Sequence, residues 1–421
     1  MVVFEEFGLD DFSSDLLDIS VKKIGEMDRH WKVSYGGSIC NTPAIFNGIV
    51  YIASCDNNVY AVDSKTGKEL WRFKTGGIIM ESSPVIYNNK VYVGSFDSYV
   101  YAMDAKTGKE IWRFKANDGI DVTLCIADGK LFFGCKDGSI YCLNAETGEK
   151  IWTFKAGGII DSSPNVFGKK LFIGSHDSYL YCLDTETGKE IWRFKTGGQV
   201  HNAPPFLIHN GVIYFGSFDN FLYAVDIETG KEIWRFPTGK YGNASAPCIY
   251  KDRLYYGCRD GIFYCLTLRG KEVWRFITRE VISCQATVYK NRIYFSSGDG
   301  NLYCLDLDGK ELWRFKTGSF IYSSPVIFDN KVYFGCWDCH LYCIDADSGE
   351  EIWRFATSTL VQSYLNPPYE IFEAELKIKH VEESREEKGG YTPSTFGSEL
   401  FRYEEGQYKL KTQYKMKSEY K

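Results

Sequence analysis

Residues 82–115 read SSPVIYNNKVYVGSFDSYVYAMDAKTGKEIWRFK, and this stretch decides the fold. It holds four short runs rich in Val, Ile, Tyr and Phe, separated by Asn-Asn, Asp-Ser and Thr-Gly-Lys turn signals. Such runs predict four β-strands joined by hairpins. In the last run, Trp112 and Phe114 share one face, while Ile111, Arg113 and Lys115 share the other. We expect the rings to pack inward, with Arg and Lys protecting the outer edge.

The stretch recurs along the chain. Tryptophan marks it at intervals of 39 to 42 residues, at Trp31, Trp71, Trp112, Trp152, Trp192, Trp234, Trp274, Trp313 and Trp353. Nine marks bound eight units, which predict an all-β, eight-bladed β-propeller of four-stranded antiparallel blades. We place the propeller at residues 30–357, between an acidic arm at 1–29 and an extension at 358–421.

Two segments contend for the outer strand of the eighth blade, one around Trp31 and one around Trp353. The Trp353 strand is expected to take this place, because its hairpin is local and closes at little entropic cost.

The D-x-x-T-G-K-x-x-W core of these units resembles the PQQ-type (quinoprotein) β-propeller repeat, over about residues 31–357. The eight copies are similar to the propeller shared by quinoprotein dehydrogenases and the assembly factor BamB. This resemblance implies the fold and leaves the function open, because such propellers serve both enzymes and interaction scaffolds. Quinoprotein dehydrogenases often carry two adjacent cysteines over the cofactor, and this chain has no Cys-Cys pair. PQQ-dependent oxidation therefore stays an alternative.

An aspartate recurs at one turn of every unit. The eight are Asp56, Asp97, Asp137, Asp177, Asp219, Asp260, Asp299 and Asp338. An Asp side chain accepts hydrogen bonds from nearby backbone N–H groups. We expect a structural role for all eight, closing the turn between the second and third strands.

Most of the 14 cysteines also follow the repeat. Before the turn aspartate, Cys alternates with Ser in the series Cys55, Ser95, Cys135, Ser175, Ser217, Cys258, Ser297 and Cys336. We expect such cysteines to be small buried fillers. Cys336, Cys339 and His340 match the haem-attachment pattern C-x-x-C-H, and Cys343 would complete a zinc-like set. Only Cys339 and His340 are particular to this blade, so we expect the match to be a coincidence of the repeat. A haem or a metal site is the alternative.

A second constellation precedes the first strands. Three residues before the proline of SSP, the units carry Cys40, Glu81, Asp121, Asp161, His201, Ala244, Ser283 and Tyr322. The innermost strands of a propeller line its central channel, so these residues should surround one mouth. Glu81, Asp121, Asp161 and His201 would then form a ligand or partner rim on successive blades. Such an arc suits a hard cation or a cationic side chain of a partner, and a solvated rim is the alternative.

Charge limits the class of partner. The chain has 49 Lys and Arg against 55 Asp and Glu; residues 1–29 hold 3 and 8, residues 358–421 hold 10 and 11, and the body is left with 36 of each. A neutral body argues against nucleic acid, and no apolar run suggests a membrane span. The arm lacks the features of a secretory signal peptide, so we expect a cytoplasmic protein with free thiols.

Segments 371–380 and 408–420 alternate as strands do, and a lone hairpin needs another surface. A second copy of the chain would supply such a surface, so self-association through this extension is one expectation. The chain contains neither G-x-S-x-G nor a P-loop motif. We therefore predict a non-catalytic intracellular scaffold for protein–protein interaction, with no cofactor. The alternative is a PQQ- or metal-dependent oxidoreductase, or a small-ligand-binding protein, that uses the channel mouth.

Overall fold

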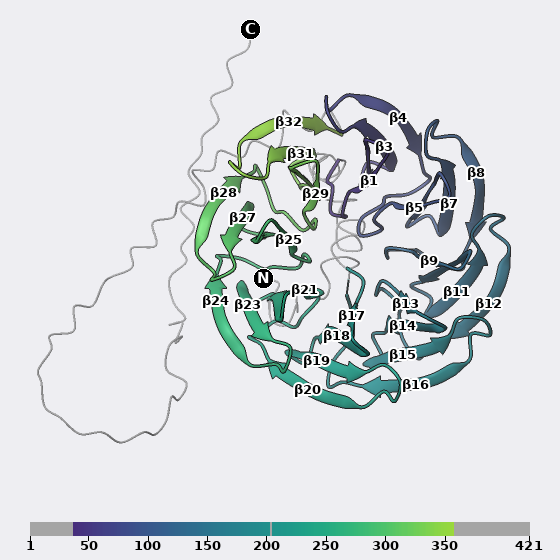
Figure 1. The fold of residues 1–421 in the computed structure, drawn as a ribbon. Coiled ribbons are helices and arrows are strands. Elements are labelled where there is room, and N and C mark those ends of the chain that lie inside the picture. The colour runs from purple at the N-terminus through teal and green to yellow at the C-terminus, as the bar shows by residue number, and fades with distance from the viewer. Residues whose placement is uncertain (1–36, 203, 358–421) are drawn as a thin grey trace, which may run out of the picture. The chain divides into compact units, whose positions relative to one another are not determined.

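The computed structural model describes residues 37–202 and 204–357, which form eight four-stranded antiparallel sheets around a central axis (Figure 1). Within each sheet the strands pair in chain order, from the axis outward. The predicted eight-bladed β-propeller is thus confirmed. The first four blades contain β1 (Ala44–Phe46), β2 (Ile49–Ser54), β3 (Asn58–Asp63), β4 (Glu69–Lys74), β5 (Val85–Tyr87), β6 (Lys90–Gly94), β7 (Tyr99–Asp104), β8 (Glu110–Lys115), β9 (Cys125–Ala127), β10 (Lys130–Gly134), β11 (Ser139–Asn144), β12 (Lys150–Lys155), β13 (Asn165–Phe167), β14 (Lys170–Gly174), β15 (Tyr179–Asp184) and β16 (Glu190–Lys195). The last four contain β17 (Leu207–His209), β18 (Val212–Ser217), β19 (Phe221–Asp226), β20 (Glu232–Pro237), β21 (Cys248–Tyr250), β22 (Arg253–Gly257), β23 (Ile262–Thr267), β24 (Glu272–Ile277), β25 (Thr287–Tyr289), β26 (Arg292–Ser296), β27 (Asn301–Asp306), β28 (Glu311–Lys316), β29 (Val326–Phe328), β30 (Lys331–Gly335), β31 (His340–Asp345) and β32 (Glu351–Ala356).

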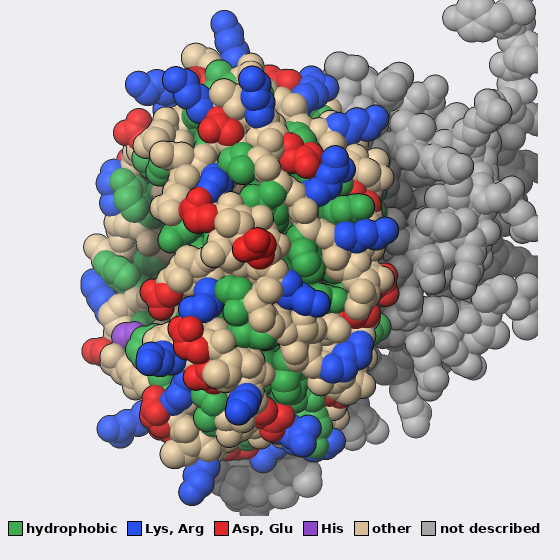
Figure 2. Space-filling view, turned by 90° about the vertical axis from the view of Figure 1, so that its right-hand side faces the viewer, with side chains coloured by type: hydrophobic (Ala, Val, Ile, Leu, Met, Phe, Trp, Pro, Cys, Tyr) green, Lys and Arg blue, Asp and Glu red, His purple; other side chains and the backbone are tan. Residues whose placement is uncertain are grey.

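The position of a strand in its blade explains its sequence. The two middle strands, such as β6 and β7, are packed between neighbouring blades on both faces and read as nearly continuous apolar runs. The outer strand β8 alternates instead, with Trp112 and Phe114 half-buried and Arg113 and Lys115 exposed. The rings thus lie on the inner side of the outer strand and the basic side chains on its outer side, as the sequence predicts. Figure 2 shows the outside of the ring, where charged side chains lie interspersed with small hydrophobic areas.

Tryptophans join neighbouring blades. The Trp71 indole N–H donates to the Ala105 carbonyl of the second blade at 3.0 Å. Its ring lies over Gly108, where a Cβ atom would come within 2.6 Å of it. Gly108 also has φ of +69°, so the turn needs glycine for its backbone conformation and for the close approach of the ring.

The ring closes non-covalently between the eighth and first blades. Trp353 on β32 pairs opposite Cys343 on β31, which confirms that the local hairpin supplies the outer strand. The Thr357 hydroxyl donates to the Gly37 carbonyl at 2.6 Å. Within the continuous chain, the Thr75 hydroxyl makes the same bond to the Gly77 carbonyl at 2.7 Å. The hydrogen bond at the ring closure is thus the same as the one found where two blades are joined by the continuous chain.

Several predictions concern segments outside the described residues: the arm at 1–29, Trp31, and the strand-like segments 371–380 and 408–420. Within the described part of the chain, no helix is long and apolar enough to cross a membrane.

Candidate functional site at the channel mouth

Two rings of side chains meet at one end of the propeller axis. The first ring precedes the innermost strands and contains Cys40, Glu81, Asp121, Asp161, His201, Ala244, Ser283 and Tyr322. The second ring precedes the turn aspartates and contains Cys55, Phe96, Lys136, His176, Phe218, Arg259, Gly298 and Trp337. We call both rings together the channel-mouth cluster.

Backbone hydrogen bonds hold the two rings together within a blade. The Lys136 amide donates to the Gly119 carbonyl at 3.1 Å, and the Trp337 amide donates to the Phe320 carbonyl at 3.1 Å. In both blades the acceptor lies two residues before the first-ring residue. The turn between the second and third strands is therefore fastened to the segment that enters the same blade.

The structure brings the four predicted rim residues together. The His201 Nε2 atom lies 3.5 Å from a Glu81 carboxylate oxygen and 3.8 Å from one of Asp161. Asp121 accepts the Glu81 amide at 3.0 Å. His201 belongs to the fifth blade and Glu81 to the second, so their approach spans the mouth.

The carboxylates meet basic side chains of the chain itself. Asp121 lies 3.8 Å from the Lys136 ammonium, and Asp161 lies 3.7 Å from His176. Arg259 packs over the Phe218 ring at 5.0 Å. The sequence suggested an acidic arc open to an external cation. The structure instead places Lys136, His176 and His201 against these carboxylates, because the second ring interleaves with the first.

Burial and charge together set the protonation states. Burial opposes charge on His201, but Asp161 and Glu81 raise its pKa to about 9, so it is protonated at neutral pH. Burial lowers the pKa of His176, although Asp161 partly offsets this. Burial likewise raises the pKa of Asp121 well above its usual range, against the pull of Lys136. Burial also opposes ionisation of Asp161, but His201, His176 and Lys136 together lower its pKa.

Several buried polar atoms in the cluster lack a hydrogen-bond partner among the described residues. They are Asp121 Oδ2, Lys136 Nζ, Asp161 Oδ1, His176 Nε2 and His201 Nε2. Asp121 and Asp161 are only 2% and 3% exposed, so these atoms cannot be satisfied by open solvent. Donors and acceptors left without partners in one place mark a site where polar groups of another molecule, or bound water, would complete the network.

The opposite half of the mouth is aromatic. Tyr322 and Trp337 have ring centroids 5.3 Å apart, and Phe320 packs edge-on to Trp337 at 5.9 Å. Phe320 is 43% exposed beside them. The mouth thus combines a charged arc with an exposed aromatic edge.

Sequence reasoning missed the second ring. It placed Cys55 in the alternating Cys and Ser series. The Cys55 amide donates to the Ser38 carbonyl, just as the Phe96 amide donates to the Ile78 carbonyl, so Cys55 belongs to the second ring. Ser54 therefore holds the position in the series that was assigned to Cys55. A signal was present. The residue before the turn aspartate differs in type between nearly all eight units, and Trp337 is the one tryptophan outside the repeat.

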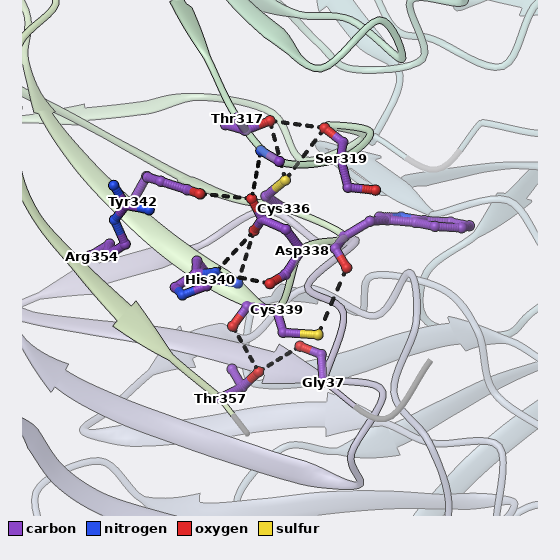
Figure 3. A network of polar contacts seen from close by, with 12 residues as sticks. Gly37, Thr317, Ser319, Cys336, Asp338, Cys339, His340, Tyr342, Arg354 and Thr357 are labelled. Carbon is purple, nitrogen blue, oxygen red and sulfur yellow. Dashed lines mark hydrogen bonds and ion pairs between the residues drawn. The ribbon is translucent and has the colours of Figure 1, made fainter. Parts of the chain in front are cut away.

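The C-x-x-C-H string does not converge on a point (Figure 3). The Cys336 sulfur lies 3.4 Å from the Thr317 hydroxyl, whereas the Cys339 sulfur lies 3.7 Å from the Trp337 carbonyl. Cys343 lies within β31, opposite Trp353. Among residues 37–202 and 204–357, no group of three His, Cys, Asp or Glu side chains is arranged to hold a metal ion.

The turn aspartates are engaged in their own turns. Asp338 accepts the Tyr342 hydroxyl at 2.7 Å and the Gly318 amide at 2.9 Å. Asp97 accepts Tyr101 at 2.6 Å and Gly76 at 2.7 Å. In these blades the aspartate joins the turn to its third strand and to the segment that enters the blade.

Two groups implied by the fold do not fit the mouth residues. A divalent cation needs several converging oxygen ligands, and here the carboxylates face Lys136, His176 and His201. A planar quinone cofactor needs room across the mouth, and there His201 comes within 3.5 Å of Glu81.

Three solved structures show the same fold. BamB from Moraxella catarrhalis is 18% identical, with a TM-score of 0.60 over 73% of this chain and 91% of that chain. The computationally designed Ika8 protein is 17% identical, with a TM-score of 0.64 over 76% and 96%. A europium-containing methanol dehydrogenase is 16% identical, with a TM-score of 0.60 over 72% and 84%. At these identities the likeness concerns the fold alone.

Family models add to this likeness. A search of curated proteins finds no match to the sequence. The family model described as outer membrane protein assembly factor BamB matches residues 23–132, in line with the resemblance of the repeats. A second model, described as the β-propeller of the beta-alanine-activating enzyme, matches residues 80–331 and 166–419. The chain belongs to this β-propeller family of the beta-alanine-activating enzyme.

Proposed function

We propose that this protein is a non-catalytic cytoplasmic recognition module that holds a protein partner at the channel mouth. The observation that supports this most is the cluster of buried polar atoms without partners, beside an exposed aromatic edge. Aromatic and Arg side chains are enriched where protein partners bind most tightly. Neither nucleic acid nor a membrane is part of this proposal.

The chemistry of the mouth favours binding over catalysis. A hydrogen bond with Cys55 raises the pKa of the Cys40 thiol well above its ordinary value; burial raises it further, and Glu81 and Asp121 add to the shift. A thiol held in its neutral form is a poor nucleophile. His201, which Asp161 and Glu81 keep protonated, is a poor general base at neutral pH.

The test is an affinity measurement with matched variants. A partner isolated with the intact chain would be titrated against wild type, Phe320→Ala and Ile111→Ala. These side chains are 43% and 45% exposed, so neither truncation should unfold the protein. We expect Phe320→Ala to weaken binding by about tenfold or more, as for an interface hot spot. Binding weakened by Ile111→Ala and unchanged by Phe320→Ala would refute the proposal.

A further inference from the structure

A cavity of about 860 Å³ lies at the seam between the sixth and seventh blades. Strand β22 lines it with Arg253 and Tyr255, and two turns line it with Leu268, Arg269, Leu307 and Asp308. These turns lie at the strand ends away from the channel mouth, so this site is separate from the proposed recognition surface. The volume is within the range of small-molecule sites.

Shorter turns accompany this cavity. In the second blade, the turn between the third and fourth strands closes through the Gly108 amide and the Asp104 carbonyl, four residues apart, at 2.9 Å. In the seventh blade, the Gly309 amide instead reaches the Asp306 carbonyl, three residues away, at 3.2 Å. The turn of the sixth blade is shortened in the same way, through the Gly270 amide. Both turns that border the cavity therefore lack one residue of the usual repeat.

The seam also lacks an ion pair that other seams have. Lys130 on β10 reaches Glu186 in the turn of the next blade at 2.8 Å, and Arg292 on β26 reaches Asp347 at 3.1 Å. Arg253 and Asp308 hold the corresponding places at this seam. No ion pair joins them in the described structure. The guanidinium of Arg253 is thus available to a ligand.

Tyr255 differs from the matching tyrosine of several other seams in the contacts of its hydroxyl. At four other seams the matching hydroxyl donates to the next blade, for example Tyr92 to the Ala145 carbonyl at 3.0 Å and Tyr294 to the Ala346 carbonyl at 2.9 Å. Tyr214, which faces the other shortened turn, shows no such bond among the described residues. Tyr255 is only 1% exposed and lines the cavity. Within the described ranges its hydroxyl has no hydrogen-bond partner. The Tyr255 hydroxyl is therefore available to a molecule bound in the cavity.

The lining defines the chemistry of a ligand for this cavity. Lys251, Arg253, Arg269 and Lys271 face Asp252 and Asp308 there, a balance of 4 − 2 = +2 charges. Leu268 and Leu307 add apolar surface with their side chains. Their carbonyls are already engaged, because they accept the indole N–H groups of Trp234 and Trp274, respectively, at 3.0 Å. We propose that the seam cavity binds an organic anion with an apolar body, such as a medium-chain carboxylate. Its charged group would pair with Arg253 and Arg269, and its apolar body would lie against Leu268 and Leu307.

The test uses probes that share one alkyl chain and differ in charge. Octanoate, octanamide and octylammonium would be titrated against the full-length protein by isothermal calorimetry and ligand-observed NMR. We expect octanoate to bind, octanamide to bind at least tenfold more weakly, and octylammonium not to bind. Equal binding of all three, or no binding of octanoate, would overturn the proposal.

Variants localise the site. Arg253→Ala combined with Arg269→Ala should weaken octanoate at least tenfold, while Lys130→Ala at the third seam should leave it unchanged. Insertion of a Thr between Asp308 and Gly309 restores the usual turn length and should abolish octanoate binding. The melting temperature of the protein, followed by circular dichroism, should stay unchanged. Octanoate binding that persists in a folded insertion variant, or in the double variant, would contradict the assignment.

Discussion

The seams between blades and the mouth of the channel are built from the same eight repeats, yet they use them in opposite ways. At the seams, each outer strand carries a Trp, as in Trp71, and each facing turn carries a Gly, as in Gly108. At the mouth, the residue before the turn aspartate runs through Cys, Phe, Lys, His, Phe, Arg, Gly and Trp. Positions that repeat without change hold the ring together, and the position that varies gives the mouth a different side chain in nearly every blade.

The largest expected effect concerns the charged arc of the mouth. Asp161→Ala would leave the protonated His201 buried with Glu81 as its remaining carboxylate neighbour. Breaking a buried ion pair on one side should lower the free energy of unfolding by about 4 kcal/mol. Urea denaturation measures this. Glu110→Ala, which removes an exposed pair with Arg113, is the control and should cost less than about 1 kcal/mol. Equal losses in both variants would show that the arc is not a buried network.

The next effect concerns a seam. Gly108→Val would force a side chain into positive φ and into the Trp71 ring, whereas Gly129 has a similar φ of +73° with nothing within 4 Å. We expect Gly108→Val to lower the free energy of unfolding by about 3 kcal/mol, and Gly129→Val by the conformational cost alone, about 1 to 2 kcal/mol. Thermal melting of both variants isolates the contribution of the ring. Equal melting temperatures would mean that the Trp–Gly contact does not hold the seam.

The mouth, unlike the seams, should contribute about 2 kcal/mol of stability that is present at pH 7 and lost by pH 10. The pKa of His201 is raised to about 9 in the folded protein, above its ordinary 6.5. The stability that this provides is complete below pH 6.5 and is lost as pH rises through 9. Wild type should therefore lose more stability than His201→Gln between pH 7 and pH 10, in urea titrations at each pH. Parallel losses in both proteins would mean that His201 is not paired in the folded state.

The smallest effect is expected on the outside of the ring. Ile111 is 45% exposed on β8, and similar aliphatic side chains occupy the same place on the other outer strands. Ile111→Thr keeps a β-branched residue at a strand position, so the free energy of unfolding should change by no more than about 0.5 kcal/mol. Denaturant titration checks this. A loss above 1.5 kcal/mol would indicate that the outer strand packs against a further part of the chain.

The sequence allowed the fold to be predicted because each signal occurs eight times. Glu81, Asp121, Asp161 and His201 were placed together by register alone, and the structure brings them into one cluster. The basic side chains beside them were not predictable in this way. Lys136 and His176 belong to a different repeat position, and the approach of His201 to Glu81 across three blades depends on the curvature and closure of the ring. Local pattern fixes which way a side chain points along its strand, but not what it meets across the axis.

The proposal that the mouth is the recognition surface can be tested most directly by site-specific photo-crosslinking. A photoreactive phenylalanine analogue would replace Phe320 at the mouth or Ile111 on the outer strand, in the full-length protein. These positions are similarly exposed, at 43% and 45%, so accessibility does not favour either one. The account predicts that the analogue at Phe320 crosslinks the partner and that the one at Ile111 does not. A partner crosslinked from Ile111 and not from Phe320 would contradict it.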